Sequence, residues 1–325
     1  MKHAERLRPG DLVEVKAPYE ILQTLDADGT SGSLPFMPEM IESCGKRFQV
    51  SRRVIKTCAF ESVSTMRVFR TDDVVLLDGL RCSGVAHDGC QKACTIFWRE
   101  AWLRRVDEAA APTRIEAEGH GELRTRLRTK RAPKTFFCQA SELFNVTNHI
   151  SRWARLGTCI REVREGNCSA LQMAQRIGIW LFWRLRKTLL GVYAHGNNKV
   201  TPAESLDLQP GELIEVKSMK SINETLNATG HNRGLYFSPD MSLMCGRKQH
   251  VERKLDKIIV DGTGEMRQMR NTVYLEGSHC GCAHVALGGC PRGEFSYWRE
   301  IWLRRAPASL NHSSNLGSNV LKNDH

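Results

Sequence analysis

Apolar and charged residues alternate along two short segments that lie far apart in the chain. After a Pro-Gly pair, residues 11–16 read DLVEVK, and after a second Pro-Gly pair, residues 212–217 read ELIEVK. A turn signal followed by a period of two is typical of a half-buried β-strand. The same reasoning predicts further strands at three places, Phe48–Val50, Val74–Leu77 and Thr272–Leu275.

The two segments begin the two copies of an internal repeat. The register continues to Cys44 in the first copy and to Cys245 in the second. It is lost across loops of different length and returns at the end, where WREAWLRR at 98–105 matches WREIWLRR at 298–305. Each copy spans roughly 100 residues and combines short strands with turn signals, which favours a small β-barrel or sandwich. We predict an SH3-like barrel for each copy.

Helical spacing dominates the region between the copies. From Phe136 to Val192 the apolar residues recur at helical intervals, Ser169 is a suitable N-cap, and Gly191 is a suitable stop. The most apolar stretch, Ile177–Trp183, is flanked by arginines, and it is much shorter than the roughly 20 residues of a membrane-spanning helix. We therefore predict a helix buried in the protein, and no membrane as a partner.

The predicted fold class is α+β, with two diverged, mostly β repeats joined by a helical segment. Before the helices, a polar segment containing the basic run Arg124–Arg131 is typical of a linker. The last residues are rich in Ser, Asn and Gly, which is typical of disorder. The predicted organisation is a first β repeat at 1–106, a basic linker at 107–135, a helical domain at 136–200, a second β repeat at 201–306 and a disordered tail at 307–325.

The composition is that of a folded globular protein, with 41% hydrophobic and 26% charged residues among 325. The first residues lack the apolar core of a secretory signal, so we expect a cytoplasmic location. Cytoplasmic thiols stay reduced, and the twelve cysteines therefore indicate metal binding rather than disulfides. The formal net charge of +11 is compatible with an anionic small molecule, an acidic protein or a nucleic acid as partner.

Three cysteines occupy matching positions in the two copies. The matched pairs are Cys44 and Cys245, Cys82 and Cys280, and Cys90 and Cys290. Structural zinc takes four thiolate or imidazole ligands, and both copies have a histidine in the loop between their second and third matched cysteines. The sequence therefore predicts two zinc ions, with the ligand sets Cys44, Cys82, His87, Cys90 and Cys245, Cys280, His284, Cys290.

The fourth ligand of each site is open, because the two histidines do not align. Cys58 or Cys94 could replace His87, and Cys282 could replace His284. An iron–sulfur cluster is the alternative cofactor, because cluster sites also need four thiolates. A thiolate beside a metal or a cation is also a nucleophile. The candidate catalytic residues are His87, Cys94 and Glu100.

Several motifs carry a resemblance to a known family. They are LPFMPEM at 34–40 with the following Cys44, the loop Cys82–Cys94 with FWREAWL at 97–103, and CQASEL at 138–143. The chain resembles a family of uncharacterised bacterial cysteine-rich proteins, some of them encoded among biosynthetic genes. The resemblance covers both repeats and the segment between them. It implies the architecture only, because the family has no established activity to carry over.

Three functions are compatible with these features. The first is a zinc-stabilised tandem-repeat binding protein, in which metal fixes long loops onto two β domains. The sequence does not identify its binding partner. The second is a metal- or thiol-dependent enzyme of bacterial small-molecule (natural product) biosynthesis, with its site in a cleft between the copies. The third is a nucleic-acid-binding factor that places the basic run Arg124–Arg131 on phosphates.

Overall fold

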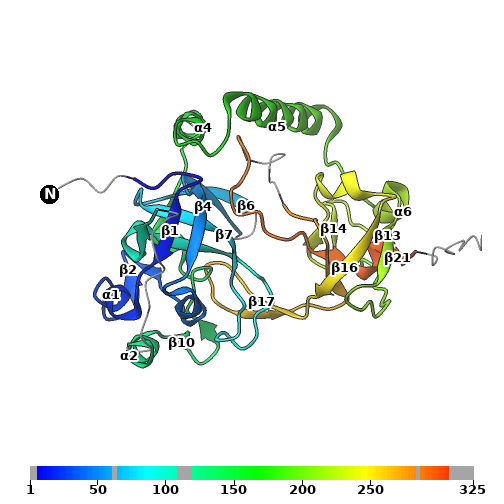
Figure 1. The fold of residues 1–325 in the computed structure, drawn as a ribbon. Coiled ribbons are helices and arrows are strands. Elements are labelled where there is room, and N and C mark those ends of the chain that lie inside the picture. The colour runs from blue at the N-terminus through cyan, green and yellow to red at the C-terminus, as the bar shows by residue number, and fades with distance from the viewer. Residues whose placement is uncertain are drawn as a thin grey trace, which may run out of the picture.

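The chain has helices and antiparallel sheets, so the α+β fold class is confirmed. The computed structural model describes residues 6–60, 64–107, 119–151, 153–280, 282 and 286–306. The tail at 307–325, predicted to be disordered, lies outside the described residues. Figure 1 shows two β units next to each other, with helices α4 (Ala154–Arg164) and α5 (Ala170–Leu190) along one edge of the molecule.

The first unit is built from residues 12–105. Its strands are β1 (Leu12–Val15), β2 (Thr30–Ser31), β3 (Leu34–Pro35), β4 (Arg47–Arg53), β5 (Lys56–Phe60), β6 (Ser64–Phe69), β7 (Val74–Arg81), β8 (Thr95–Arg99) and β9 (Leu103–Arg105). Its helical turns are α1 (Pro18–Leu22) and the 3₁₀ helices η1 (Pro38–Ser43) and η2 (Glu100–Trp102).

The second unit is built from residues 213–305. Its strands are β13 (Leu213–Val216), β14 (His231–Asn232), β15 (Leu235–Tyr236), β16 (Lys248–Lys254), β17 (Lys257–Ile259), β18 (Met266–Gln268), β19 (Thr272–Leu275), β20 (Trp298–Arg299) and β21 (Leu303–Arg305). Its helical turns are α6 (Met219–Asn223) and the 3₁₀ helices η3 (Met241–Met244) and η4 (Glu300–Trp302).

Corresponding strands take the same places in two five-stranded sheets. The order is β8-β7-β4-β1-β9 in the first unit and β20-β19-β16-β13-β21 in the second. In each unit a 3₁₀ helix precedes the last strand, which returns to pair with the first strand. The registers also correspond, since Leu12 lies opposite Gln49 as Leu213 lies opposite His250.

The two cores contain the same aromatic arrangement. Phe36 packs edge-on against Trp102 with ring centroids 5.2 Å apart, and Phe237 packs edge-on against Trp302 at the same distance. All four rings are buried. Large aromatic side chains contribute much of the apolar area that a small core removes from water. The tryptophans of the repeated WRE motif are therefore core residues.

The region predicted to be a basic linker contains regular structure. It includes α2 (His120–Arg126), β10 (Lys130–Ala132) and β11 (Thr135–Phe136), while residues 108–118 lie outside the described residues. Leu123 of α2 is fully buried in the core of the first unit. The arginines of α2 lie mostly on its exposed side, which explains why the segment has the composition of a linker.

Residues 136–150 complete the first unit and do not form a separate helical domain. They contain α3 (Leu143–Val146) and β12 (Thr147–His149), and β12 pairs with β6 of the first unit. Phe136, Leu143 and Val146 are part of the first core. The apolar residues of this segment, whose spacing suggests a helix, are thus explained by packing against the β unit.

Helix α5 begins and ends where the sequence predicts. The Ser169 hydroxyl accepts a hydrogen bond from the Gln172 amide, and Gly191 follows the last helical residue with a φ of 73°. The predicted burial of Ile177–Trp183 is wrong, because Met173 is the one buried residue of α5. Neither core of the β units includes a residue of α5, which lies outside both (Figure 1). No helix within the described ranges is long and apolar enough to cross a membrane.

A hairpin of the second unit packs onto the first. It is formed by β17 and β18, and Figure 1 shows β17 reaching toward the first unit. The Gly262 amide donates a hydrogen bond of 3.0 Å to the Ala140 carbonyl, and the Gln91 amide donates one of 3.0 Å to the Lys257 carbonyl. The chain segment between β19 and β20 also contacts the first unit, and it contains three cysteines.

Candidate metal centre

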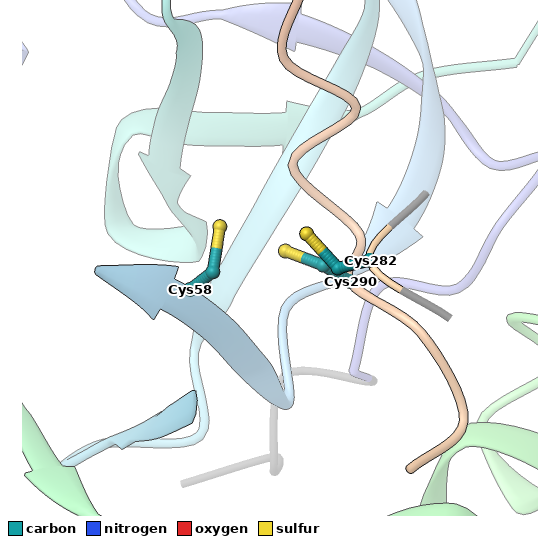
Figure 2. A group of neighbouring side chains, drawn as sticks. All are labelled: Cys58, Cys282 and Cys290. Carbon is teal, nitrogen blue, oxygen red and sulfur yellow. The ribbon is translucent and has the colours of Figure 1, made fainter. Parts of the chain in front are cut away.

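Three cysteines from both β units come together at this interface. Cys58 lies on β5 of the first unit, whereas Cys282 and Cys290 lie on the segment between β19 and β20 of the second. Their Sγ atoms all lie within 4.8 Å of one another, and Figure 2 shows them around one space. In the described part of the chain, this is the one group of three or more Cys, His, Asp or Glu residues that is close enough to hold a metal ion.

A fourth cysteine adjoins the group. The Sγ atoms of Cys280 and Cys282 are 2.9 Å apart. Cys282 has a φ of 51°, a left-handed conformation that is unusual for a residue with a side chain. The two ends of the cysteine segment are joined by a backbone hydrogen bond of 2.6 Å, which the Cys280 amide donates to the Glu294 carbonyl. The Cys280 and Cys282 thiols are therefore direct neighbours.

Two buried cations of the interface hold β5 against the cysteine segment. Lys56 Nζ donates a hydrogen bond of 2.5 Å to the Leu287 carbonyl, and the Arg292 guanidinium donates one of 3.0 Å to the Cys58 carbonyl. Burial lowers the pKa of Lys56, an effect that the charge of Glu162 partly offsets. Both cations are almost fully buried. The approach of Cys58 to Cys290 is thus fixed by contacts that do not involve the thiols.

The three grouped thiols differ in how readily they ionise. Cys290 accepts hydrogen bonds from Cys282 and Cys58, which lower its pKa well below the usual range of a thiol. The bond with Cys282 lowers the pKa of Cys58, but the bond with Cys290 and burial raise it to about 12 overall. The arrangement therefore favours one thiolate shared by its neighbours. A metal ion would replace the shared protons by binding several thiolates at once.

The donor set fits a zinc ion. With Zn–S bonds of about 2.3 Å, four tetrahedral sulfurs lie about 3.8 Å from one another. The sulfurs of Cys58, Cys282 and Cys290 all lie within 4.8 Å of one another, which is compatible with this spacing, and Cys280 Sγ next to Cys282 is the candidate for the fourth. Four thiolates around Zn²⁺ carry two net negative charges, and the buried cations Lys56 and Arg292 lie beside them. The surroundings therefore suit a thiolate-rich site.

The ligand set predicted for the first copy is not assembled. Cys82, His87 and Cys90 line a small cavity of about 20 Å³ together with Cys94, but Cys44 does not reach it. Cys44 packs against the core of the first unit, and burial raises the pKa of its thiol to about 12. The Cys90 sulfur accepts a hydrogen bond from the Ile259 amide. These contacts are those of packed thiols.

His87 has both ring nitrogens in hydrogen bonds. Nδ1 lies 2.6 Å from Glu39 Oε1, and Nε2 lies 3.0 Å from the Phe137 carbonyl oxygen. Burial raises the pKa of Glu39, but the hydrogen bond and charge of His87 outweigh it, so that the pKa is lower than usual. Both neighbours of the ring are thus acceptors. Both ring nitrogens are therefore engaged by these neighbours, and neither is free for a metal.

The ligand set predicted for the second copy is assembled in part. Cys290 belongs to the group, Cys280 adjoins it, and Cys282 belongs to it as the alternative to His284. His284 lies outside the described residues. Cys245 instead packs against the core of the second unit. The sequence thus identified the cysteine segment of the second copy. It did not predict that Cys58 of the first copy joins this segment.

The remaining catalytic candidates have structural contacts. Burial raises the pKa of Cys94, which keeps this thiol protonated. Glu100 accepts a hydrogen bond of 2.9 Å from the Leu7 amide and pairs with the buried Arg53. Its counterpart Glu300 accepts hydrogen bonds from the backbone amides that precede β13. In each unit, the repeated glutamate therefore binds backbone amides of the segment that precedes the first strand.

The basic run Arg124–Arg131 is partly neutralised. Arg128 pairs with Asp28 at 3.1 Å, Lys130 with Asp88 at 3.0 Å and Arg131 with Glu142 at 2.6 Å. The Arg128 guanidinium also lies 4.0 Å from the centroid of the Phe137 ring. Cations that already have carboxylate partners release fewer counterions on binding a phosphate backbone. These contacts weigh against the nucleic-acid-binding alternative.

A cavity of about 530 Å³ opens beside the cysteines, between the two units. Its wall includes all four cysteines, Cys58, Cys280, Cys282 and Cys290. Lys92 of the first unit lines it, as do the aromatic residues Tyr236, Phe295 and Tyr297 and the cations Arg233 and Arg267 of the second. A volume of this size is within the range of small-molecule sites.

The comparisons with known proteins leave the chain without a family assignment. No family model, no curated protein and no solved structure matches it.

Proposed function

We propose that the protein is a zinc-stabilised tandem-repeat binding protein in which one zinc ion joins the two repeats. Its ligands are Cys58, Cys280, Cys282 and Cys290. The observation that carries the proposal is the convergence of thiols from both units within 4.8 Å. A closed tetrathiolate site contributes its binding free energy to folding. The ion therefore stabilises the interface between the repeats.

The repeats are, in this proposal, two copies of one SH3-like barrel. The same strand order in both sheets and the 3₁₀ helix before the last strand support it. The packing of Phe36 on Trp102 and of Phe237 on Trp302 supports it as well. Duplication gave both copies a matching cysteine segment, and the zinc site uses the segment of the second copy.

Zinc is favoured over an iron–sulfur cluster by the spacing of the sulfurs. The four ligands of a four-iron cluster bind four irons, and those of a two-iron cluster are divided between two irons, so the full ligand set is spread farther apart than that of a single ion. Three sulfurs that all lie within 4.8 Å of one another suit a single ion. Zinc gives colourless protein, whereas an iron–sulfur cluster gives brown protein with visible absorption.

The test of the metal centre is substitution with cobalt(II). Four thiolates around Co²⁺ give intense absorption bands that depend on ligand number and type. We expect a tetrathiolate spectrum from the reconstituted protein and a weaker spectrum from Cys280→Ser, which leaves three thiolates. A matched control is Cys44→Ser, since Cys44 lies outside the group. An octahedral, nearly colourless cobalt protein would contradict the proposal.

The binding site of this protein is, in our proposal, the cavity between the units, and its ligand is an anionic small molecule with an apolar body. Arg233 and Arg267 offer cations, and Tyr236 and Phe295 offer aromatic surface. Titration calorimetry with benzoate and larger arylcarboxylates tests this. Arg267→Gln should weaken binding about tenfold, in line with the loss of one charge-assisted hydrogen bond. Arg304→Gln is the control, because Arg304 is exposed on the sheet and pairs with Glu215. Equal affinity in both variants would contradict it.

A second candidate, a metal-dependent enzyme, is favoured by one observation. The four cysteines lie in the cavity wall, so a ligand in the cavity would be next to the metal. Catalytic zinc keeps one coordination position open for water or substrate, whereas structural zinc does not. Imidazole added to the cobalt protein distinguishes the two. A spectral shift favours the enzyme, and an unchanged spectrum favours the structural site.

A further inference from the structure

Helix α5 has an amphipathic pattern whose apolar side faces away from the protein. Leu171, Phe182, Leu185 and Leu189 are all more than half exposed. At 100° per residue, these four positions fall within a sector of about 60° on the helix. Met173, the buried residue of α5, lies on the opposite side. The helix is therefore attached by one side and presents an apolar stripe on the other.

Helix α4 also exposes apolar side chains. Leu156 and Ile160 are one turn apart on α4, and their side chains are 60% and 68% exposed. Trp153, directly before the helix, is 91% exposed. Figure 1 shows α4 and α5 at the same edge of the molecule. Exposed apolar side chains that gather in one place mark an interaction surface rather than an ordinary protein surface.

The charges of α5 indicate what this surface contacts. The helix contains Arg176, Arg184, Arg186 and Lys187 and no Asp or Glu. None of these four cations pairs with a carboxylate among the described residues. At 100° per residue, Arg176, Arg184 and Lys187 lie on the side opposite the stripe, and Arg186 lies nearer to it. A helix with Phe and Leu on one side, cations on the other and no acidic residue is typical of segments that lie in the headgroup region of an anionic bilayer.

A second copy of the chain is a poorer occupant than a bilayer. A second α5 helix would offer the same four cations and no acidic residue, so it would supply no negative charge to complement them. Anionic lipid headgroups supply the missing negative charge, and the acyl chains supply the apolar medium. No described helix can cross a membrane, so the contact is with the surface.

We propose that the α4–α5 hairpin is a peripheral membrane-binding element that lays its apolar stripe into the headgroup region of an anionic phospholipid bilayer. This departs from the expectation, based on sequence, that no membrane is a partner. The cations of α5 contact the lipid headgroups, and Leu171, Phe182, Leu185 and Leu189 enter the boundary with the acyl chains. The two β units then stand on the membrane surface, and the zinc site takes no part in the contact.

Sedimentation with lipid vesicles tests the proposal. The full-length protein should sediment with vesicles that contain phosphatidylglycerol and remain in solution with vesicles of pure phosphatidylcholine. The double variant Phe182→Ser/Leu185→Ser should partition at least about tenfold more weakly, because it removes apolar area that enters the bilayer. The matched control is Leu243→Ser, whose leucine is 68% exposed on η3, outside the α4–α5 hairpin.

The charge requirement is tested separately. Arg184→Gln/Lys187→Gln should weaken binding to phosphatidylglycerol vesicles about tenfold or more, and high salt should do the same. Circular dichroism shows whether the variants keep their helix content. Three results would overturn the proposal: no sedimentation with anionic vesicles, equal binding to both vesicle types, or an oligomer that the Phe182→Ser/Leu185→Ser variant dissociates while vesicle binding is unchanged.

Discussion

Lys92 of the first unit donates a hydrogen bond of 2.5 Å to Asp261 of the second unit. Both side chains are buried, and Asp261 also accepts a hydrogen bond of 3.1 Å from the buried Arg292. Burial raises the pKa of Asp261, but Arg292 and Lys92 lower it more, to about 2 overall. This carboxylate therefore compensates two buried cations at the interface that also contains the cysteines.

Asp261→Asn leaves the buried Lys92 without its carboxylate partner, whereas Arg292 keeps its ion pair with Glu294. Removal of one partner of a buried ion pair costs about 3 to 5 kcal/mol of unfolding free energy. We expect a loss of this size, measured by urea denaturation. Lys254→Met serves as the control, because Lys254 pairs with Asp207 on the surface. A loss for Asp261→Asn no larger than that of the control would mean that the interface contact is absent in solution.

The depressed pKa of Asp261 also predicts a dependence on pH. A carboxyl group whose pKa is lower in the folded state adds stability above its unfolded pKa of about 4 and loses it as the pH falls toward 2. The shift from 3.8 to about 2 corresponds to about 2 kcal/mol. The stability difference between wild type and Asp261→Asn should therefore shrink by about this amount between pH 6 and pH 2. A constant difference would contradict the assignment.

The docking of the β17–β18 hairpin is tested by glycine substitution. A Cβ atom on Gly264 would lie 2.5 Å from the Phe136 carbonyl oxygen, whereas one on Gly277 would meet nothing within 4 Å. Both glycines have a φ near 70°, so alanine is strained at both positions. Gly264→Ala should therefore cost at least about 1 kcal/mol more than Gly277→Ala, measured by thermal unfolding. Equal costs would show that the hairpin does not approach the first unit.

The two cores should respond alike to loss of one hydrogen bond. The Trp102 indole N–H donates to Thr24 at 3.0 Å, and the Trp302 indole N–H donates to Thr225 at 3.0 Å. Thr24→Val and Thr225→Val each leave a buried donor unpaired, which costs about 1 to 3 kcal/mol. Thermal unfolding of both variants checks this. If one substitution is neutral and the other is not, the two units are not equivalent.

The strand positions could be predicted from the sequence because alternation and turn signals are local. The strands expected at Phe48–Val50, Val74–Leu77 and Thr272–Leu275 fall within β4, β7 and β19. The burial of α5 could not be predicted, because helical spacing shows that a helix has an apolar side but not which surroundings that side meets. Residues 136–150 were wrongly assigned to a helical domain for the same reason. Their apolar residues Leu143 and Val146 belong to the core of the first β unit.

The cysteine segment at 280–290 could be found by matching the two copies, but its partner could not. Matching the copies favours ligand sets within one copy, and it led to Cys44 and Cys245, which lie in separate cores. Cys58 has no counterpart in the second copy. The proximity of the Cys58 and Cys290 sulfurs depends on how the two units pack against each other. The available signal is that three of the candidate ligands, Cys58, Cys94 and Cys282, have no counterpart in the other copy.

The zinc content of the untreated protein and of three serine variants distinguishes one site shared between the repeats from a separate site in each repeat. Native mass spectrometry of the full chain should show one zinc ion per chain. Cys58→Ser should lose it, although Cys58 belongs to the first unit, while Cys44→Ser and Cys245→Ser should keep it. Two zinc ions per chain, with losses in Cys44→Ser and Cys245→Ser and none in Cys58→Ser, would contradict a site shared between the repeats.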